Sequence, residues 1–134
     1  MLSQSWALAS IMLLIKLVVA GFVMTIVFQT AHVVPNCEFV YPSSEEIRTS
    51  WHRHQLNTTA NFAQKNKIVT YLLGGLNFQI EHHLFPSICH VYYPEISKIL
   101  KETAVEFNLP YHENNSIWST IALHYSMLKK LGRE

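Results

Sequence analysis

The fold is decided by residues 6–28, "WALASIMLLIKLVVAGFVMTIVF", an apolar run whose only charge is Lys16. A helix needs roughly 20 such residues to cross the hydrocarbon core of a bilayer. A secretory signal peptide would place positive residues before the run and a small-residue cleavage site after it, and neither is present. The run therefore predicts a transmembrane helix, ending near His32 to Val34, from which Lys16 snorkels toward water.

Charge indicates which side of the membrane holds the rest of the chain. Every Lys and Arg other than Lys16 lies between Arg48 and Arg133, and none precedes the run. The positive-inside rule then places the C-terminal side in the cytoplasm. A net charge of +1 gives no footprint for nucleic acid. Cys37 and Cys89 form no CxxC pattern and are expected to be free thiols.

The remaining residues predict helices separated by polar loops. Ser43 or Ser44 would cap a helix that carries Trp51, His52 and His54, with Glu45 and Glu46 in its first turn. Residues 68–85 are short for a second crossing, so they predict a helix at the membrane interface or against the span. No segment predicts a strand. The predicted fold is therefore all-α, a membrane-embedded helical protein with one clear span and a cytosolic helical cap.

Two amphipathic helices are predicted near the C-terminus. The first covers Tyr93 to Asn108, with Pro94 in its first turn and lysines on its polar side. Its packed face is expected to contain Ile96, Ile99, Leu100, Thr103, Ala104 and Phe107. The second is capped by Ser116, and its apolar stripe is expected to contain Trp118, Ile121, Ala122, Tyr125 and Leu128.

The stretch "LNFQIEHHLFP", residues 76–86, sets polar side chains among leucines and phenylalanines. On a helix Gln79, His82 and His83 stand at i, i+3 and i+4 and share one face, while Glu81 points away. Two imidazoles and one amide oxygen would suit iron, zinc or copper. The alternative is that the two histidines only cap, or hydrogen-bond at, a helix end.

Other histidines are weaker candidates. His32, with Gln29 on the same face, lies at the end of the span, where an ionisable residue is a functional candidate or an anchor at the headgroups. His52 and His54 diverge on a helix, so at most one could join a site. The side chains expected to support the ligands are Gln29, His54, Asn77 and His90. His112 and His124 are expected to be solvated or packed.

These motifs together resemble a known family. "GGLNFQIEHHLFP" with the following "YPEI" resembles the last histidine box of membrane fatty acid desaturases, in the front-end group where glutamine replaces the first histidine of HxxHH. "FQTAHVV" is similar to the segment near the end of the fourth span. "WHRHQLNTTANFA" resembles the family's W..HQ..TTANF stretch, and "NLPYHE" with "LKKLG" resembles its tail.

The resemblance implies a two-iron site in which His82 and His83 are ligands and His32 is the extra ligand from the span. Gln79 would ligate weakly or through a water, and no catalytic residue is expected beyond the metal centre. The family's earlier HxxxH and HxxHH boxes are missing, since no histidine precedes His32. We therefore expect the C-terminal portion of a desaturase, with residues 6–33 as its last span and about 43–134 as cytosolic or interfacial helices.

The complete enzyme would introduce a double bond into a fatty acyl chain, held as acyl-CoA or acyl lipid. It would use molecular oxygen and electrons from a b-type cytochrome or a ferredoxin-like donor. This chain alone is expected to be incomplete and inactive. Two alternatives remain open: a membrane-anchored metal-binding fragment without turnover, and a di-iron lipid hydroxylase of the same superfamily.

Overall fold

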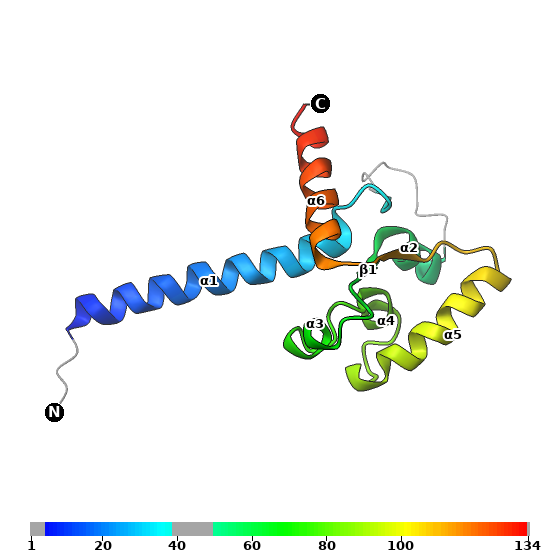
Figure 1. The fold of residues 1–134 in the computed structure, drawn as a ribbon, viewed down its shortest axis with the longest axis horizontal. Helices are drawn as coiled ribbons and strands as arrows, with labels where there is room; N and C mark the ends of the chain where they lie inside the picture. Colours follow the sequence, from blue (N-terminus) through cyan, green and yellow to red (C-terminus); the bar gives the residue numbers. More distant parts are fainter. Residues whose placement is uncertain (1–4, 39–49, 134) are drawn as a thin grey trace.

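A long helix projects from a small, mostly helical cap (Figure 1). The computed structural model describes residues 5–38 and 50–133. Its helices are α1 (Trp6–His32), α2 (Trp51–Thr58), α3 (Lys67–Leu72), α4 (Gln79–Leu84), α5 (Tyr93–Glu106) and α6 (Ile117–Leu131), with a 3-10 turn η1 (His90–Tyr92). The strands are β1 (Ala60–Phe62) and β2 (His112–Asn114). The predicted all-α class is confirmed, apart from this short strand pair.

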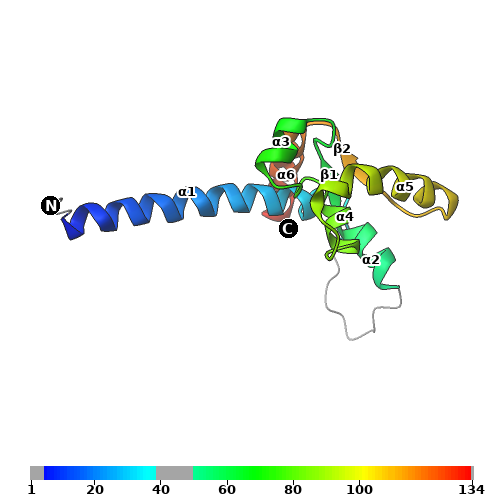
Figure 2. The ribbon, with the colours of Figure 1, turned by 90° about the horizontal axis from the view of Figure 1, so that it is seen from below.

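Helix α1 begins after Ser5, whose side chain accepts a hydrogen bond from the amide of Leu8, and ends at His32 as predicted. It stands clear of the cap along most of its length (Figure 2). Only 6% of its most apolar 18-residue window is buried. An apolar surface this large is stable in lipid and not in water, so α1 is a candidate membrane span by length and composition.

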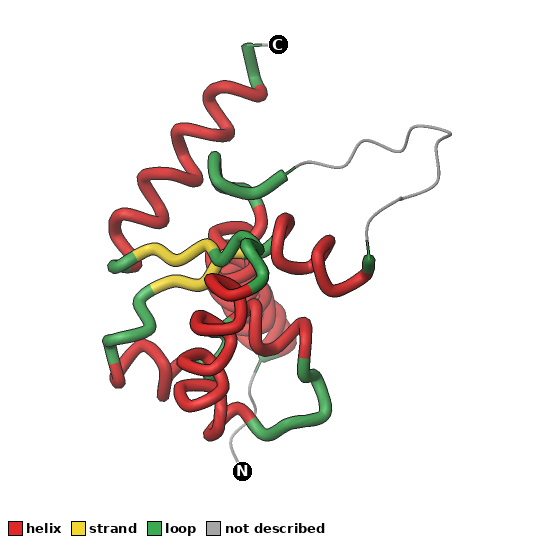
Figure 3. The backbone as a smooth tube through the Cα atoms, turned by 90° about the vertical axis from the view of Figure 1, so that its right-hand side faces the viewer, coloured by secondary structure: helices red, strands yellow, loops and turns green. Residues whose placement is uncertain are grey.

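The end of α1 is held by the strand pair. Strand β1 runs parallel to β2, with Ala60 opposite His112 and Phe62 opposite Asn114, and the two lie between the helices of the cap (Figure 3). Phe62 and Ala63 form one core cluster with Val27 and Ala31 of α1. The cap is therefore attached to the last two turns of the span.

Helices α2 and α4 begin at residues that the sequence did not predict. Helix α2 begins at Trp51 and is capped by Ser50, whose side chain accepts a hydrogen bond from the amide of Arg53. The predicted caps Ser43 and Ser44, with Glu45 and Glu46, lie outside the described residues. The single helix predicted over 68–85 is wrong, because Gly74 and Gly75 take left-handed backbone angles, φ 56° and 78°, and separate α3 from α4.

Helix α5 has the predicted position, and four of the six residues of its predicted packed face are buried or half-buried. Tyr93, Ser97 and Ala104 are buried, and Ile96 and Leu100 are half-buried. Ile99 and Phe107 are each 64% exposed, so these two residues do not pack within this chain, and only packing on the membrane face is left for them. The buried stripe follows an i, i+4, i+11 pattern through one tyrosine, one serine and one alanine, which apolar periodicity does not find.

Helix α6 is capped by Ser116 as predicted, through a bond from the amide of Ser119. Its predicted stripe faces mostly outward, with Trp118 78% and Tyr125 68% exposed. The buried residues are Thr120 and Met127. The helix packs against α1, and His124 Nδ1 lies 2.9 Å from the carbonyl oxygen of Val33, the residue after α1.

The two cysteines differ in burial, and this difference predicts how fast each thiol reacts. Cys37 is buried beside Val34 and Ala60, and burial raises its pKa to about 12, whereas Cys89 is exposed. At pH 8 only about one Cys37 thiol in ten thousand would be the reactive thiolate. We expect a maleimide to modify Cys89 and to leave Cys37 at least about 100-fold slower until denaturant is added, as measured by mass spectrometry. Equal labelling of both thiols in the folded protein would contradict this packing.

Candidate functional site

The site is built on α4, a helix of six residues. Asn77 and Phe78 before it and Gln79, Ile80 and Glu81 within it are all buried. The helix ends at Leu84, one residue before the position that Pro86 restricts. Its N-terminal half is therefore fixed in the core, while His82 and His83 project from its C-terminal half and are only half-buried.

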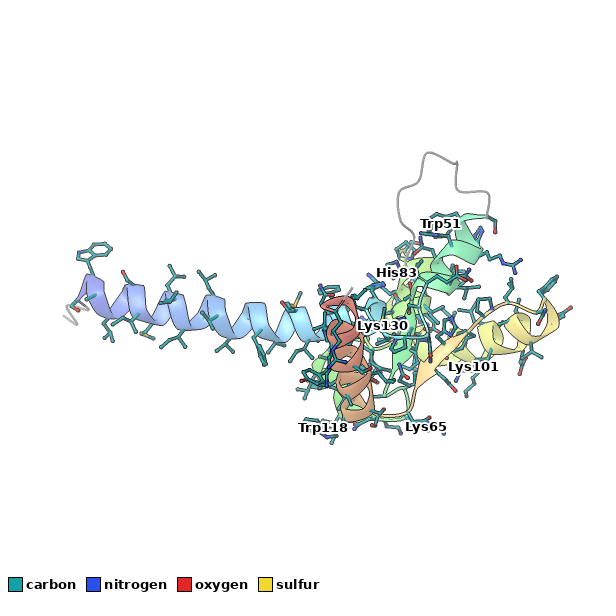
Figure 4. All side chains as sticks on the ribbon, turned by 90° about the horizontal axis from the view of Figure 1, so that it is seen from above. Trp51, Lys65, His83, Lys101, Trp118 and Lys130 are labelled. Carbon is teal, nitrogen blue, oxygen red and sulfur yellow. The ribbon has the colours of Figure 1, made fainter. Side chains whose placement is uncertain are left out.

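The structure brings His82 and His83 close to His32, the residue that the family resemblance added to them. The ring centroids of His32 and His83 are 5.0 Å apart, and those of His82 and His83 are 5.8 Å apart. Figure 4 shows His83 where the cap meets the C-terminal end of α1. Two segments far apart in the sequence thus present three imidazoles to one region.

Hydrogen bonds orient two of the three rings. His32 Nδ1 lies 3.1 Å from the carbonyl oxygen of Thr58. A carbonyl oxygen can only accept, so Nδ1 carries the hydrogen and Nε2 keeps its lone pair. His82 Nδ1 lies 3.4 Å from the hydroxyl of Tyr93. Neither Thr58 nor Tyr93 was predicted to contact the site.

Electrostatics keep the central ring neutral. Burial lowers the pKa of His83 to about 4, and the neighbouring His32 and His82 lower it further. A neutral imidazole has a free nitrogen lone pair, which is the form that binds a metal.

Gln79 is the clearest unsatisfied group in the site. Its side chain is 0% exposed, and neither its oxygen nor its nitrogen has a hydrogen-bond partner in the described part of the chain. A buried amide without partners costs on the order of 1–3 kcal/mol. Its position fits the predicted role of an amide that contacts a metal or a bound water.

The ligand set within the described residues is incomplete. Among residues 5–38 and 50–133, no group of three or more His, Cys, Asp or Glu side chains is arranged to hold a metal ion. The ring planes of His82 and His83 are nearly perpendicular, with an interplanar angle of 84°. The donors present suit iron, zinc or copper in type, and further ligands are needed to complete a site.

The other residues singled out in the sequence differ in burial and in their contacts. Asn77 is buried and its amide nitrogen donates to Thr70 Oγ1 at 3.0 Å, so it braces the turn before α4. His54 is half-buried on α2. Gln29 and His90 are exposed, and His52 is exposed with its ring against Trp51. His124 packs on α1 and His112 is half-buried in β2, as the packing alternative predicted.

A buried polar network behind α4 was not predicted. The carboxylate of Glu81 accepts hydrogen bonds from Asn61 Nδ2 at 2.7 Å and from the Tyr111 hydroxyl at 2.6 Å. Burial raises the pKa of Glu81, and these hydrogen bonds partly offset the effect. Its partners lie far away in the sequence, so helical spacing could show only that Glu81 points away from the histidines.

Comparison with known proteins finds similarity over most of the chain. The family model for fatty acid desaturases matches residues 1–115. The sn-1 linoleoyl-lipid 6-desaturase of Arthrospira platensis is 42% identical over 111 residues, which cover 83% of this chain and 30% of the relative. The acyl-lipid (8-3)-desaturase of Physcomitrium patens is 39% identical over 114 residues, covering 85% and 24%.

A third relative, the Delta(5) fatty acid desaturase A of Dictyostelium discoideum, is 34% identical over 121 residues, covering 87% of this chain and 26% of the relative. The chain therefore spans about a quarter to a third of the length of these relatives. No solved structure matches.

The turn that leads into α4 generates a stability prediction. A Cβ at Gly75 would lie 2.7 Å from His90 Cβ, in addition to the strain of φ 78°, whereas Gly74 has φ 56° and open space around it. Gly74→Ala should lower the free energy of unfolding by about 1–2 kcal/mol from backbone strain alone. Gly75→Ala should cost about 1–3 kcal/mol more, because His90 must move.

Denaturant unfolding followed by circular dichroism in lipid nanodiscs measures these differences. Gly21→Ala is the matched control, since its Cβ would meet nothing within 4 Å and alanine suits a helix interior. Equal losses for Gly74→Ala and Gly75→Ala would show that η1 does not pack on this turn.

Proposed function

Because the chain belongs to the fatty acid desaturase family, we propose that it forms the C-terminal part of a membrane-bound, oxygen-dependent di-iron enzyme that introduces a double bond into a fatty acyl chain. The observation that carries the proposal is the approach of His32, from the end of the span, to His82 and His83 on α4. Neutral imidazoles on separate rigid elements are what a metal site needs from its scaffold.

The reaction class follows from the strength of the bond that is broken. Desaturation removes two hydrogen atoms from neighbouring methylene groups, and molecular oxygen is reduced to two waters with two electrons and two protons from outside the substrate. Side-chain acids and bases cannot oxidise an unactivated C–H bond, so bound iron supplies that chemistry. A small redox protein, of the b-type cytochrome or ferredoxin class, would supply the electrons.

The chain's own residues hold and orient the metal centre. His32, His82 and His83 would ligate through ring nitrogens, and the Thr58 carbonyl keeps His32 in the tautomer with Nε2 free. Gln79 would ligate weakly or orient a water, which would satisfy its buried amide. The remaining ligands would come from the part of the relatives that this chain does not cover, since the sequence has no HxxxH or HxxHH motif before His32.

A metal-binding fragment without turnover is the second candidate function, favoured by the incomplete ligand set. A lipid hydroxylase is less favoured, since the relatives compared above are named as desaturases. The substrate class that fits is a fatty acyl group held in or at the membrane that α1, a candidate span, would cross.

A chimera tests the proposal. This chain would replace the matching region of the Arthrospira platensis relative, and fatty acids would be profiled by gas chromatography in a host that lacks the product. We expect the chimera to form a double bond and this chain alone to form none. His82→Ala or His83→Ala should lower product by more than the roughly 10- to 100-fold cost of changes behind the ligands.

His52→Ala is the matched control, because this side chain is exposed and contacts Trp51 rather than the site. Full activity of the His83→Ala chimera would refute the metal role of α4. A new double bond formed by this chain alone would refute the need for further ligands.

We also propose that the cap lies on the cytoplasmic side of the membrane. The support is the distribution of charge, since every Lys and Arg other than Lys16 follows α1. Cys89 is an exposed reporter thiol in the cap and Cys37 is buried.

Labelling of Cys89 with a membrane-impermeant maleimide tests this orientation in a bacterial host. We expect no labelling in intact spheroplasts and full labelling in inverted inner-membrane vesicles. A Cys89→Ser variant should stay unlabelled in both, because Cys37 is inaccessible. Labelling of Cys89 from outside intact cells would reverse the proposed orientation.

A further inference from the structure

Glu81 is a fully buried carboxylate without a cation. Its side chain is 0% exposed, and the one ion pair within the described residues joins Lys101 and Glu113. Burying an unpaired charge is costly, and an apolar side chain of similar volume would usually be more stable there. The position of Glu81 therefore calls for an explanation other than stability.

The carboxylate is held by two side chains from outside α4. Asn61 in β1 donates to Oε2 at 2.7 Å, and the Tyr111 hydroxyl, just before β2, donates to Oε1 at 2.6 Å. The amide oxygen of Asn61 also accepts the backbone N–H of Ile80 at 2.9 Å. Asn61 is thus hydrogen-bonded to two successive residues of α4, Ile80 and Glu81.

Tyr111 extends this hydrogen-bond network to α5. Its hydroxyl lies 2.9 Å from Ser97 Oγ on α5 and also accepts from Gln64 Nε2 at 3.1 Å. Hydrogen bonds to a buried charged group are short and directional, and a fully satisfied network is rigid. The network therefore links α4 to β1, to α5 and to the segment that leads into β2.

Helix α4 needs such a support. It has six residues and no side-chain cap at Phe78, and isolated helices of that length are not stable. Glu81 projects from the side opposite His83, since residues two apart on a helix differ by about 200°. A rotation of α4 about its axis would carry the histidines away from His32, and the bonds to Glu81 oppose that rotation.

We propose that Asn61, Glu81 and Tyr111 form a positioning network that fixes the rotation of α4 and so sets the direction of Gln79, His82 and His83 toward His32. This inference rests on the proposed function, in which these side chains bind iron. Glu81 and Tyr111 act through α4 and do not touch the metal.

The variants Glu81→Gln and Tyr111→Phe test the network with little change in volume. The matched controls are Glu102→Gln and Tyr125→Phe, whose side chains are exposed. The first measurement is hydrogen–deuterium exchange of this chain in nanodiscs without metal. We expect the amides of His82 and Phe85, which bond within α4, to exchange at least about tenfold faster in both test variants, with α1 and α6 unchanged.

The second measurement is iron affinity of the chimera carrying the same variants. We expect Glu81→Gln and Tyr111→Phe each to lower the iron affinity about 10- to 100-fold. The double variant should bind iron no more weakly than the weaker of the two single variants, because both substitutions act on the bond between Glu81 and Tyr111. Exchange and iron affinity equal to those of the controls would overturn the proposal. Faster exchange throughout the cap would also overturn it, because the network would then stabilise the fold as a whole.

The two proposals fail in different ways. If the unaltered chimera takes up no iron, the proposed function is wrong, and the exchange experiment still decides whether the network fixes α4. If the unaltered chimera binds iron and the test variants bind it equally well, only the positioning network is wrong.

Discussion

The packing of β1 against the last turns of α1 is the contact on which the site depends. Phe62 and Ala63 pack on Val27 and Ala31, and this contact fixes the cap relative to the span. The same strand carries Asn61, which holds the backbone and side chain of α4. His32 and His83 meet because one short strand contacts both of the elements that carry them.

Several polar side chains on and around α4 are buried in the cap. Glu81, Asn61 and Tyr111 satisfy one another, whereas both polar atoms of Gln79 are buried without a partner among the described residues. Satisfied polar groups rigidify a core, and an unsatisfied one indicates a missing partner. Helix α4 therefore carries both a satisfied buried group, Glu81, and an unsatisfied one, Gln79.

Local sequence patterns predicted those parts of the structure that depend on interactions between residues close together in the sequence. The end of α1, the position of α5, the Ser116 cap and the meeting of His32 with His82 and His83 all followed from spacing, capping residues or motif. The packed faces of α5 and α6 followed only in part, because tertiary contacts bury small and polar residues such as Ser97 and Thr120, which apolar periodicity does not mark. Strands of three residues and the partners of Glu81 depend on contacts between distant segments, which periodicity does not contain.

The central claim is that this chain supplies part of one shared di-iron centre. The most direct measurement is the number of iron ions bound per molecule of the purified chimera, before and after His82→Ala and His83→Ala. We expect two irons in the chimera and fewer than two in each variant, with His52→Ala unchanged. Two irons retained in both variants would contradict it.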